Sequence, residues 1–252
     1  MAAELRTCVL LAAGRGTRLG EAALRTPKPL LEVGGAPILS HIIDGLASAG
    51  IARFVIVTGW LAGQVEAWCS RQAQLRANFE IETVRQHEIN GTAGALLSAA
   101  PCLAHEERFA FGWGDVLMDR EFYARFVAAA RRDAHDLMLA VNRVHDPTAG
   151  AAVYVDGQMR VERIVEKPAP GSSTTNWNSA GLFAAHGIIF DYLRRLTPSA
   201  RGELELPEAI SMMIDDQRVV RALELRGFWS DIGTPAALAL ARRHFRLSPR
   251  KP

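Results

Sequence analysis

The feature that most constrains the fold is a short apolar segment that runs directly into a glycine-rich turn. Residues 8–13 read CVLLAA, and the turn that follows at residues 14–18 reads GRGTR. A continuous apolar run of this length, ended at once by glycines, is typical of a buried strand rather than an amphipathic one. The segment therefore predicts a buried strand whose carboxyl end opens into a tight turn.

Strand-like and helix-like segments alternate through the first half of the chain, and the second half is richer in strands. This rhythm favours parallel strands covered by helices on both faces. Predicted strands are residues 8–13, 54–58, 79–84, 109–113, 137–141, 151–155, 160–166 and 181–185. Predicted helices are residues 37–49, 92–100, 121–132, 188–196, 206–215 and 235–245.

Length and composition exclude several classes of protein. The chain has 252 residues, of which 49% are hydrophobic, so one α/β domain over residues 1–252 is the first expectation and two smaller domains stay open. A net charge of +2 without a run of basic residues gives no sign of nucleic-acid binding. Three widely spaced cysteines indicate neither a disulfide framework nor a cysteine metal site. We expect no membrane segment and a cytoplasmic protein.

The glycine-rich turn is a candidate phosphate site. Gly14 and Gly16 allow backbone N–H groups to point at one place, which suits phosphate oxygens, although a turn without a ligand explains them as well. The pattern lacks both the Lys-Ser/Thr pair of a P-loop and the glycine spacing of a dinucleotide fingerprint. Arg15 and Arg18 lie in the turn, and Lys28 follows between two prolines. Several cations converging on the turn would match a triphosphate.

These residues resemble the signature of the sugar-1-phosphate nucleotidyltransferases, which is approximately LAAGxGTRL followed by PKPLLPVxGKP. The chain has LAAGRGTRL at residues 11–19 and TPKPLLEVGGAPI at residues 26–38. The resemblance implies that Arg18 stabilises the leaving pyrophosphate and that Lys28 contacts phosphates. It implies nucleotide binding by Leu11, Ala12, Ala13, Gly14, Arg15, Gly16 and Thr17.

The same resemblance implies a fold. The family has an α/β, three-layer, Rossmann-like nucleotidyltransferase fold with a mixed, mostly parallel central sheet. By this likeness the nucleotide-binding part spans about residues 1–135 and the sugar-binding part about residues 136–252. Motifs in the expected order run from Val9 to about His244. We expect a catalytic core alone, without the β-helix domain that acetyltransferase-bearing relatives carry.

Two acids are candidate ligands of Mg²⁺. Attack of one phosphate on another brings two anions together and usually needs Mg²⁺, which takes a few carboxylates besides waters and phosphate oxygens. Asp115 follows a predicted strand, and Asp231 lies in the segment FWSDIGT. Each alone would also fit an ordinary turn or cap, but together they resemble the family's GD and W-x-D-x-G-T metal motifs. Asp119 fits a helix N-cap better, and Trp113 stands where a smaller residue is expected.

The segment QHEINGTAG at residues 86–94 is a candidate nucleobase site. The amide of Gln86 can read a base edge with its donor and acceptor, and Gly91 and Thr92 allow the backbone to approach a flat ring. The family carries Gln or Glu five residues before such a glycine. Gln resembles the uridylyl- and thymidylyltransferases, whereas guanylyltransferases more often have Glu. Under a shifted register, Glu88 would take this place.

The second half carries candidate sugar-binding residues. Glu166 and Lys167 resemble the family's EKP motif, in which the acid accepts sugar hydroxyls and the lysine binds the sugar phosphate. Gly150 corresponds to a glycine near the sugar. Asn178 opens the segment NSAG, which has one residue more than the family's N-A-G or N-T-G, so Ser179 is an alternative to it.

The predicted reaction is Mg²⁺-dependent single displacement, which joins a nucleoside triphosphate, with UTP or dTTP favoured, to a sugar-1-phosphate. It belongs to sugar-nucleotide biosynthesis, as for cell-envelope polysaccharide. One alternative is a guanylyl- or cytidylyltransferase that acts on mannose-, heptose- or N-acetylmuramic acid 1-phosphate or on phosphocholine. Another is a non-catalytic, regulatory subunit that binds sugar nucleotides. A homo-oligomer stays open.

Overall fold

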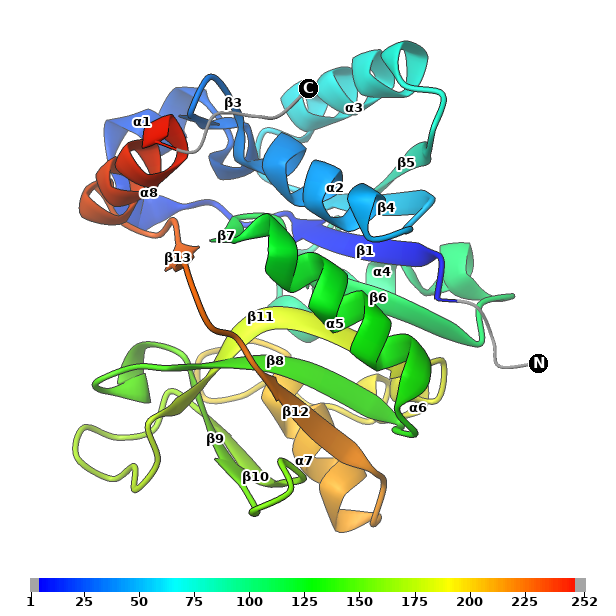
Figure 1. The fold of residues 1–252 in the computed structure, drawn as a ribbon, viewed down its shortest axis with the longest axis vertical. Coiled ribbons are helices and arrows are strands. Elements are labelled where there is room, and N and C mark those ends of the chain that lie inside the picture. Colours follow the sequence, from blue (N-terminus) through cyan, green and yellow to red (C-terminus); the bar gives the residue numbers. More distant parts are fainter. Residues whose placement is uncertain (1–4, 248–252) are drawn as a thin grey trace.

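The computed structural model describes residues 5–247 and is built around a nine-stranded mixed sheet (Figure 1). The order along the sheet is β10-β9-β11-β6-β1-β4-β5, and β8 joins β11 to β12. The outermost residues of the expected domain, 1–4 and 248–252, lie outside the described residues. The strands are β1 (Thr7–Ala12), β4 (Arg53–Thr58), β5 (Glu80–Arg85), β6 (Arg108–Trp113), β8 (Leu137–Arg143), β9 (Ala151–Val155), β10 (Val161–Glu166), β11 (Trp177–His186) and β12 (Val220–Glu224).

Strand β1 lies at the centre of the parallel part of the sheet. It pairs in parallel with β4 on one side and with β6 on the other, and all six of its residues are buried. Because parallel strands end at the same edge, the turns after β1 and β6 are neighbours. The N–H of Gly114 donates to the carbonyl of Leu11 at 2.9 Å. The predicted phosphate turn thus lies beside the predicted metal acid Asp115.

Alternate residues of β1 face two separate cores, which makes the fold three-layered. Cys8 and Leu10 pack with the first core, whereas Val9 and Leu11 pack with the second. The first core includes α2 (Ile38–Ser48), α3 (Ala62–Leu75) and α5 (Arg120–Arg132). The second includes α4 (Thr92–Ser98), α6 (Ile189–Leu193) and α7 (Leu206–Asp215). Figure 1 shows α2 and α5 in front of β1, with α4 behind it. The predicted Rossmann-like fold with a mixed central sheet is confirmed.

Strand β11 begins four residues earlier than predicted, at Trp177 instead of Gly181. Its first residues pair antiparallel with β8, Trp177 with Arg143 and Asn178 with Asn142. The register then shifts between Ser179 and Phe183, and Gly181 has a φ of 84° within this irregular stretch. Glycine adopts such a left-handed angle without steric cost, so the bulge explains the glycine in the middle of a strand.

Several elements were not predicted from the sequence pattern. Helix α3 was missed because its polar residues leave a weak apolar stripe, and only Ala62, Val65, Trp68 and Cys69 are buried in it. Strands β7 (Val116–Met118) and β13 (Trp229–Asp231) have three residues each and pair only with one another. Such short strands depend on a partner far away in the sequence, which local periodicity cannot indicate. Unpredicted as well were α1 (Glu21–Arg25), β2 (Glu32–Val33), β3 (Ala36–Pro37) and β12.

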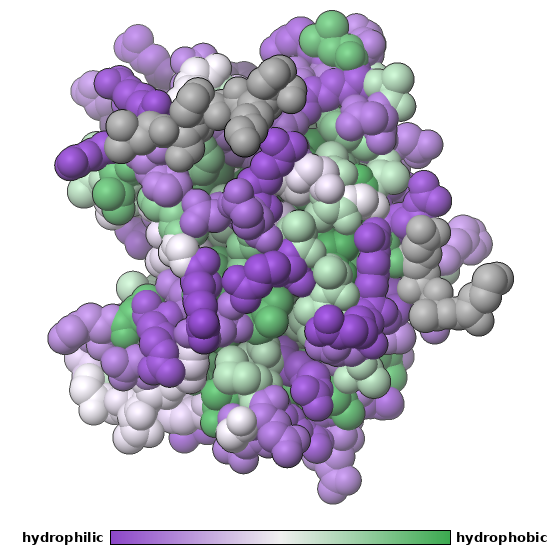
Figure 2. Space-filling view, in the orientation of Figure 1, coloured by the Kyte–Doolittle hydropathy of each residue, from purple (hydrophilic) through white to green (hydrophobic). Residues whose placement is uncertain are grey.

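Polar side chains cover most of the face shown in Figure 2, with apolar residues scattered between them. The large exposed apolar residues of the described chain are single and far apart in sequence: Leu24, Leu75, Ile89 and Leu240. Scattered exposure of this kind is ordinary for a folded surface. No helix within residues 5–247 is long and apolar enough to cross a membrane.

Candidate active site

Lys28 lies between the two predicted metal acids. Its ammonium nitrogen is 2.6 Å from Oδ2 of Asp115 and 2.9 Å from Oδ1 of Asp231, although the three residues are far apart in sequence. Asp115 directly precedes β7, and Asp231 ends β13. The pairing of these strands places Val116 opposite Asp231, which brings the two carboxylates to the same side. The short pair that periodicity could not predict therefore assembles the centre of the site.

Burial and charge act against one another in this cluster. Burial raises the pKa of Asp115, and the neighbouring Asp231 raises it further, while the charge of Lys28 opposes both. For Lys28, burial alone would lower the pKa, but the two carboxylates outweigh burial and the pKa is raised. Lys28 is therefore a firmly charged ammonium with only 8% of its side chain exposed. A fixed cation of this kind suits a site for phosphates.

Arg18 adds a second cation at the edge of this cluster. A guanidinium nitrogen of Arg18 lies 3.7 Å from Oδ2 of Asp231, and 65% of the side chain is exposed. The turn that carries it bends at Gly16, which has a φ of 64°. A Cβ atom at Gly14 would meet nothing within 4 Å, so a ligand can approach the backbone there. Arg15 points elsewhere, toward the ring of Trp60 at 5.9 Å.

The donor set of Asp115 and Asp231 fits Mg²⁺. Both carboxylates approach a single atom, the Lys28 nitrogen, to within 3 Å, and their side chains are 29% and 40% exposed. Mg²⁺ in phosphate-transfer sites takes one or two carboxylates, while waters and substrate phosphates fill the remaining positions. Among residues 5–247, no group of three or more acidic, histidine or cysteine side chains forms a metal cage. Two partly exposed carboxylates match the arrangement in which waters and substrate phosphates supply the remaining ligands.

The predicted nucleobase segment forms a compact loop. Gln86 is only 3% exposed, and its amide nitrogen donates to the side-chain oxygen of Asn90 at 3.1 Å and to the carbonyl of Gly91 at 3.4 Å. Gly91 has a φ of 105°, and a Cβ atom there would lie 2.5 Å from the carbonyl oxygen of Leu204. The buried side chain of Gln86 thus holds the loop together through its hydrogen bonds to Asn90 and Gly91. A glycine is required at position 91 because the backbone of Leu204 lies so close to it.

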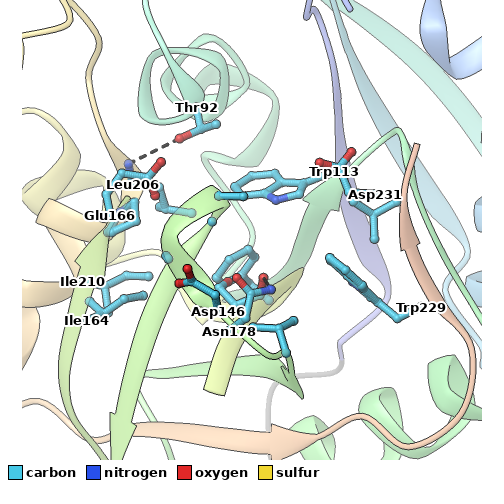
Figure 3. Close-up of a pocket in the computed structure, with 18 of the residues that line it drawn as sticks. Thr92, Trp113, Asp146, Ile164, Glu166, Asn178, Leu206, Ile210, Trp229 and Asp231 are labelled. Carbon is cyan, nitrogen blue, oxygen red and sulfur yellow. Dashed lines mark hydrogen bonds between the residues drawn. The ribbon is translucent and has the colours of Figure 1, made fainter. Parts of the chain in front are cut away.

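One cavity of about 300 Å³ unites residues from both halves of the chain (Figure 3). Figure 3 shows Trp113, Trp229 and Asp231 to one side of it and Ile164, Ile210 and Glu166 to the other. Predicted site residues that line the cavity are Arg18, Thr92, Gly150, Glu166, Asn178, Ser179 and Asp231. Lys167 and Gln86 are not among the described residues that line it.

Glu166 is a partly buried acid at the far end of the cavity from Asp231, with 22% of its side chain exposed. Burial raises its pKa to about 7, and the neighbouring carboxylates of Glu205 and Glu203 add to the rise. Lys167 and Arg201 oppose it, at 3.8 Å and 3.5 Å from its Oε1 atom. Arg201 is closer to Glu205, at 2.7 Å, so the guanidinium pairs mainly with Glu205 and opposes the rise in the pKa of Glu166 only weakly. Glu166 can therefore both accept and donate a hydrogen bond near neutral pH.

Lys167 turns away from the Lys28 cluster. Its backbone has a φ of 41°, and its N–H donates to the carbonyl of Gly150 at 2.8 Å. Its ammonium is nearest to Glu166, and 45% of the side chain is exposed. The structure places Lys167 beside Glu166, and not in contact with the two predicted metal acids.

Asn178, Gly150 and Ser179 form the polar floor of the cavity. The amide nitrogen of Asn178 donates to Asn142 at 3.0 Å and to the carbonyl of Ser179 at 2.8 Å. A Cβ atom at position 150 would clash with the amide oxygen of Asn178, so a larger residue there would displace this amide. The hydroxyl of Ser179 is buried and has no hydrogen-bond partner among the described residues. Both candidates of the NSAG segment therefore face the same cavity.

Sequence reasoning missed some lining residues and described Asp119 incompletely. Trp229 and Asp146 line the cavity but were not proposed as site residues, and Asp146 also accepts a hydrogen bond from the N–H of Thr148. The Asp-Pro pair after a strand was the available signal. Asp119 does occupy the N-cap position of α5, but its side chain makes no capping hydrogen bond. It accepts instead from the N–H of Phe228 at 2.6 Å and contacts His244 at 3.0 Å.

The geometry agrees with similarities to known proteins. A sequence model described as nucleotidyl transferase matches residues 7–246. The bifunctional protein GlmU of Methanococcus aeolicus is 32% identical over 94% of this chain and 53% of the relative. The mannose-1-phosphate guanyltransferase beta-B of Xenopus laevis is 29% identical over 90% of this chain and 61% of the relative. The chain thus spans about half the length of GlmU and about three-fifths of the guanyltransferase.

Solved structures show the same fold. A UDP-glucose pyrophosphorylase complexed with UDP-glucose superposes with a TM-score of 0.85 at 18% identity and covers 97% of this chain and 100% of its own. A second structure is that of a putative glucose-1-phosphate thymidylyltransferase from Bacillus anthracis. It superposes with a TM-score of 0.83 at 24% identity and covers 98% of this chain and 97% of its own. The resemblance seen in the sequence is confirmed at the level of the family: the chain belongs to the nucleotidyl transferase family.

Proposed function

We propose that the protein transfers a nucleoside monophosphate from a nucleoside triphosphate to a sugar-1-phosphate and releases pyrophosphate. The observation that carries the proposal is the Lys28 ammonium held between Asp115 and Asp231, because Asp231 also lines the cavity that Arg18 and Glu166 share. Cations and carboxylates for phosphates thus stand at one end of the cavity and a hydroxyl-binding acid at the other. An acceptor with a phosphate at one end and hydroxyls at the other fits this polarity.

The chemistry requires two anions to meet. An oxygen of the sugar phosphate attacks the α-phosphorus, the bond between the α-phosphorus and the bridging oxygen breaks, and pyrophosphate leaves with the electron pair. Lys28 and Arg18 stabilise charge that spreads over the phosphate oxygens. Asp115 and Asp231 would hold Mg²⁺, which supplies further charge neutralisation when bound. Transfer in a single displacement needs no covalent intermediate on the protein.

Support for the nucleobase is divided. Gln86 and its loop favour UTP or dTTP, as the family's Gln-bearing members do. The relative from Xenopus laevis is named a guanyltransferase, which favours GTP as the second candidate. Gln86 donates to Asn90 and Gly91, so the side-chain oxygen is the part of its amide left to read a base. We place UTP or dTTP first and GTP second.

Pyrophosphate release from the purified protein tests the proposal. ATP, CTP, GTP, UTP and dTTP are each combined with glucose-, mannose- and N-acetylglucosamine 1-phosphate and with phosphocholine in the presence of Mg²⁺. We expect turnover with UTP or dTTP and a sugar-1-phosphate. Turnover with GTP alone would overturn the nucleobase preference, and turnover with phosphocholine alone would overturn the sugar.

Asp115→Ala separates an enzyme from a binding subunit. We expect this variant to lose turnover while it keeps the fold, as measured by circular dichroism. Asp191→Ala is the matched control, because Asp191 lies on α6 with 72% of its side chain exposed. Equal pyrophosphate release by the Asp115→Ala variant and the unmodified protein would remove the two-acid metal site from the proposal.

A further inference from the structure

Trp113 is a large aromatic residue at the junction between the phosphate end and the acceptor end of the cavity. It is the last residue of β6, two positions before Asp115, and it lines the same cavity as Arg18 and Asp231. Figure 3 shows its ring at the Asp231 side of the cavity, with Trp229 below it. The sequence resemblance leads us to expect a smaller residue at this position.

The fold is arranged around this indole. A Cβ atom at Gly181 would overlap the pyrrole edge of the Trp113 ring, so the bulge in β11 makes the room that the ring needs. The ring also packs against Phe183, whose ring centroid lies 5.3 Å away. A ring held against a backbone and another ring has little freedom to move aside for a ligand. Trp113 is therefore a rigid wall.

Two polar groups beside this wall lack partners. The indole N–H of Trp229 donates to the carbonyl of Ala180 at 2.9 Å, and that of Trp60 donates to Ala23 at 3.1 Å. The indole N–H of Trp113 makes no hydrogen bond with any residue that the structure describes. Ser179, on the same cavity, has a buried hydroxyl that is likewise without a partner within residues 5–247. Buried polar groups are nearly always paired, so a ligand oxygen is the natural partner of the Ser179 hydroxyl. The indole N–H of Trp113, a half-buried residue, is open to the same ligand.

We propose that Trp113 is a specificity-determining residue that limits the size of the acceptor. This inference rests on the proposed function. The cavity of about 300 Å³ lies at the lower end of the range of roughly 300–1,000 Å³ that is usual for small-molecule sites. With the indole fixed by Gly181 and Phe183, the cavity accommodates a single phosphorylated ring with small substituents. Acceptors with a bulky group are excluded by collision with the ring.

The test compares acceptors that differ only in bulk. The parent is glucose 1-phosphate or N-acetylglucosamine 1-phosphate, whichever supports turnover. The two bulky homologues carry a butanoyl group at C2 or at C6. At C2 it replaces the acetyl group of N-acetylglucosamine 1-phosphate or acylates the hydroxyl of glucose 1-phosphate, and at C6 it acylates the hydroxyl of either parent. For the unmodified protein, we expect kcat/KM for at least one homologue to be about tenfold or more below that for the parent, as for an overfilled pocket. Trp113→Asn should reduce this ratio severalfold, whereas Trp113→Phe, which keeps most of the bulk, should preserve it.

Trp177→Asn is the matched control, because Trp177 begins the neighbouring strand β11, has the Arg143 guanidinium over its ring and does not line the cavity. It should leave the ratio unchanged. Equal kcat/KM for the parent and both homologues in the unmodified protein would overturn the inference, as would a Trp113→Asn variant that folds and keeps the original ratio. An absence of turnover with every nucleotide and acceptor would instead overturn the proposed function, and with it this inference.

Discussion

The ammonium of Lys28 is 2.6 Å from the carboxylate of Asp115, in the place that we propose for the metal ion. The contact with Asp231 is nearly as short, at 2.9 Å, so one cation neutralises both acids. A buried acid without its cationic partner would be costly. Lys28 thus has two roles that compete: it stabilises the two acids, and it occupies the space between them.

Lys28→Met should therefore raise the affinity of the nucleotide-free protein for Mn²⁺ while it abolishes turnover. The variant removes an ammonium that competes with the metal, and it also removes the fixed cation that the phosphates need. We expect the free energy of unfolding to fall by on the order of 1–3 kcal/mol, because two partly buried carboxylates then repel each other. Mn²⁺ binding is measured by electron paramagnetic resonance. Arg226→Met, at a side chain that is 76% exposed, is the control; equal Mn²⁺ affinity in both variants would contradict the competition.

Gly91→Ala should destabilise the protein. The left-handed backbone and the approach to Leu204 leave no room for a methyl group, so the loop of residues 86–91 must move. We expect a loss on the order of 1–3 kcal/mol in urea unfolding and a raised KM for the nucleotide. Gly63→Ala is the matched control: its Cβ atom would meet nothing within 4 Å in helix α3, where alanine is favoured over glycine. A Gly91 variant as stable as the Gly63 variant would show that the loop tolerates the displacement.

Gln86→Glu should change the choice of nucleobase. A carboxylate would place an acceptor oxygen where the amide nitrogen now donates to the oxygens of Asn90 and Gly91, so both hydrogen bonds are lost. Leaving buried polar groups unpaired costs about 1–3 kcal/mol. We expect kcat/KM for UTP and dTTP to fall by about tenfold or more, with a smaller fall for GTP. Equal falls for all nucleotides would assign Gln86 a structural role only.

The sequence was sufficient for elements whose pattern is local. β1, α2 and α7 were predicted with nearly correct bounds, because a buried strand or an amphipathic helix carries its own periodicity. The strands β7 and β13 could not be found, since each has three residues and is held by a partner more than a hundred residues away. The same limit applies to the Lys28 cluster: its members could be named singly, but no pattern shows that they meet at one nitrogen atom.

The acceptor end was the least predictable part of the site. Asn178 and Ser179 were alternatives in the sequence, and both line the cavity because the strand register shifts just after them. The packing of Trp113 against Gly181 depends on the antiparallel pairing of β6 with β11, which the sequence of neither strand indicates. Likewise, the raised pKa of Glu166 comes first from burial and then from Glu205, a residue that sequence reasoning did not connect with the site.

Stability should depend on pH through Glu166. Its pKa is about 7 in the folded protein, against an ordinary value of 4.5. Between these values the unfolded chain loses the proton while the folded protein keeps it, so stability falls as pH rises. We expect the unmodified protein to lose on the order of 3 kcal/mol between pH 4.5 and pH 8 relative to Glu166→Gln, measured by urea unfolding. Parallel pH profiles for the two proteins would contradict this.

The KM for the acceptor should also change with pH through the carboxyl group of Glu166. Acceptor binding should improve as pH rises, whereas stability falls. Above pH 7 the ionised Glu166 accepts hydrogen bonds from acceptor hydroxyls, and below pH 7 the protonated group accepts fewer. The groups that face it are Glu203, Glu205, Lys167 and Arg201. KM for the acceptor should therefore fall between pH 6 and pH 8. The phosphate of the sugar also titrates near pH 6 and affects KM in both proteins. The pH dependence of KM is therefore compared with that of Glu166→Gln, in which only the substrate titrates. A Gln variant whose KM falls equally over this interval would assign the whole dependence to the substrate and none to Glu166.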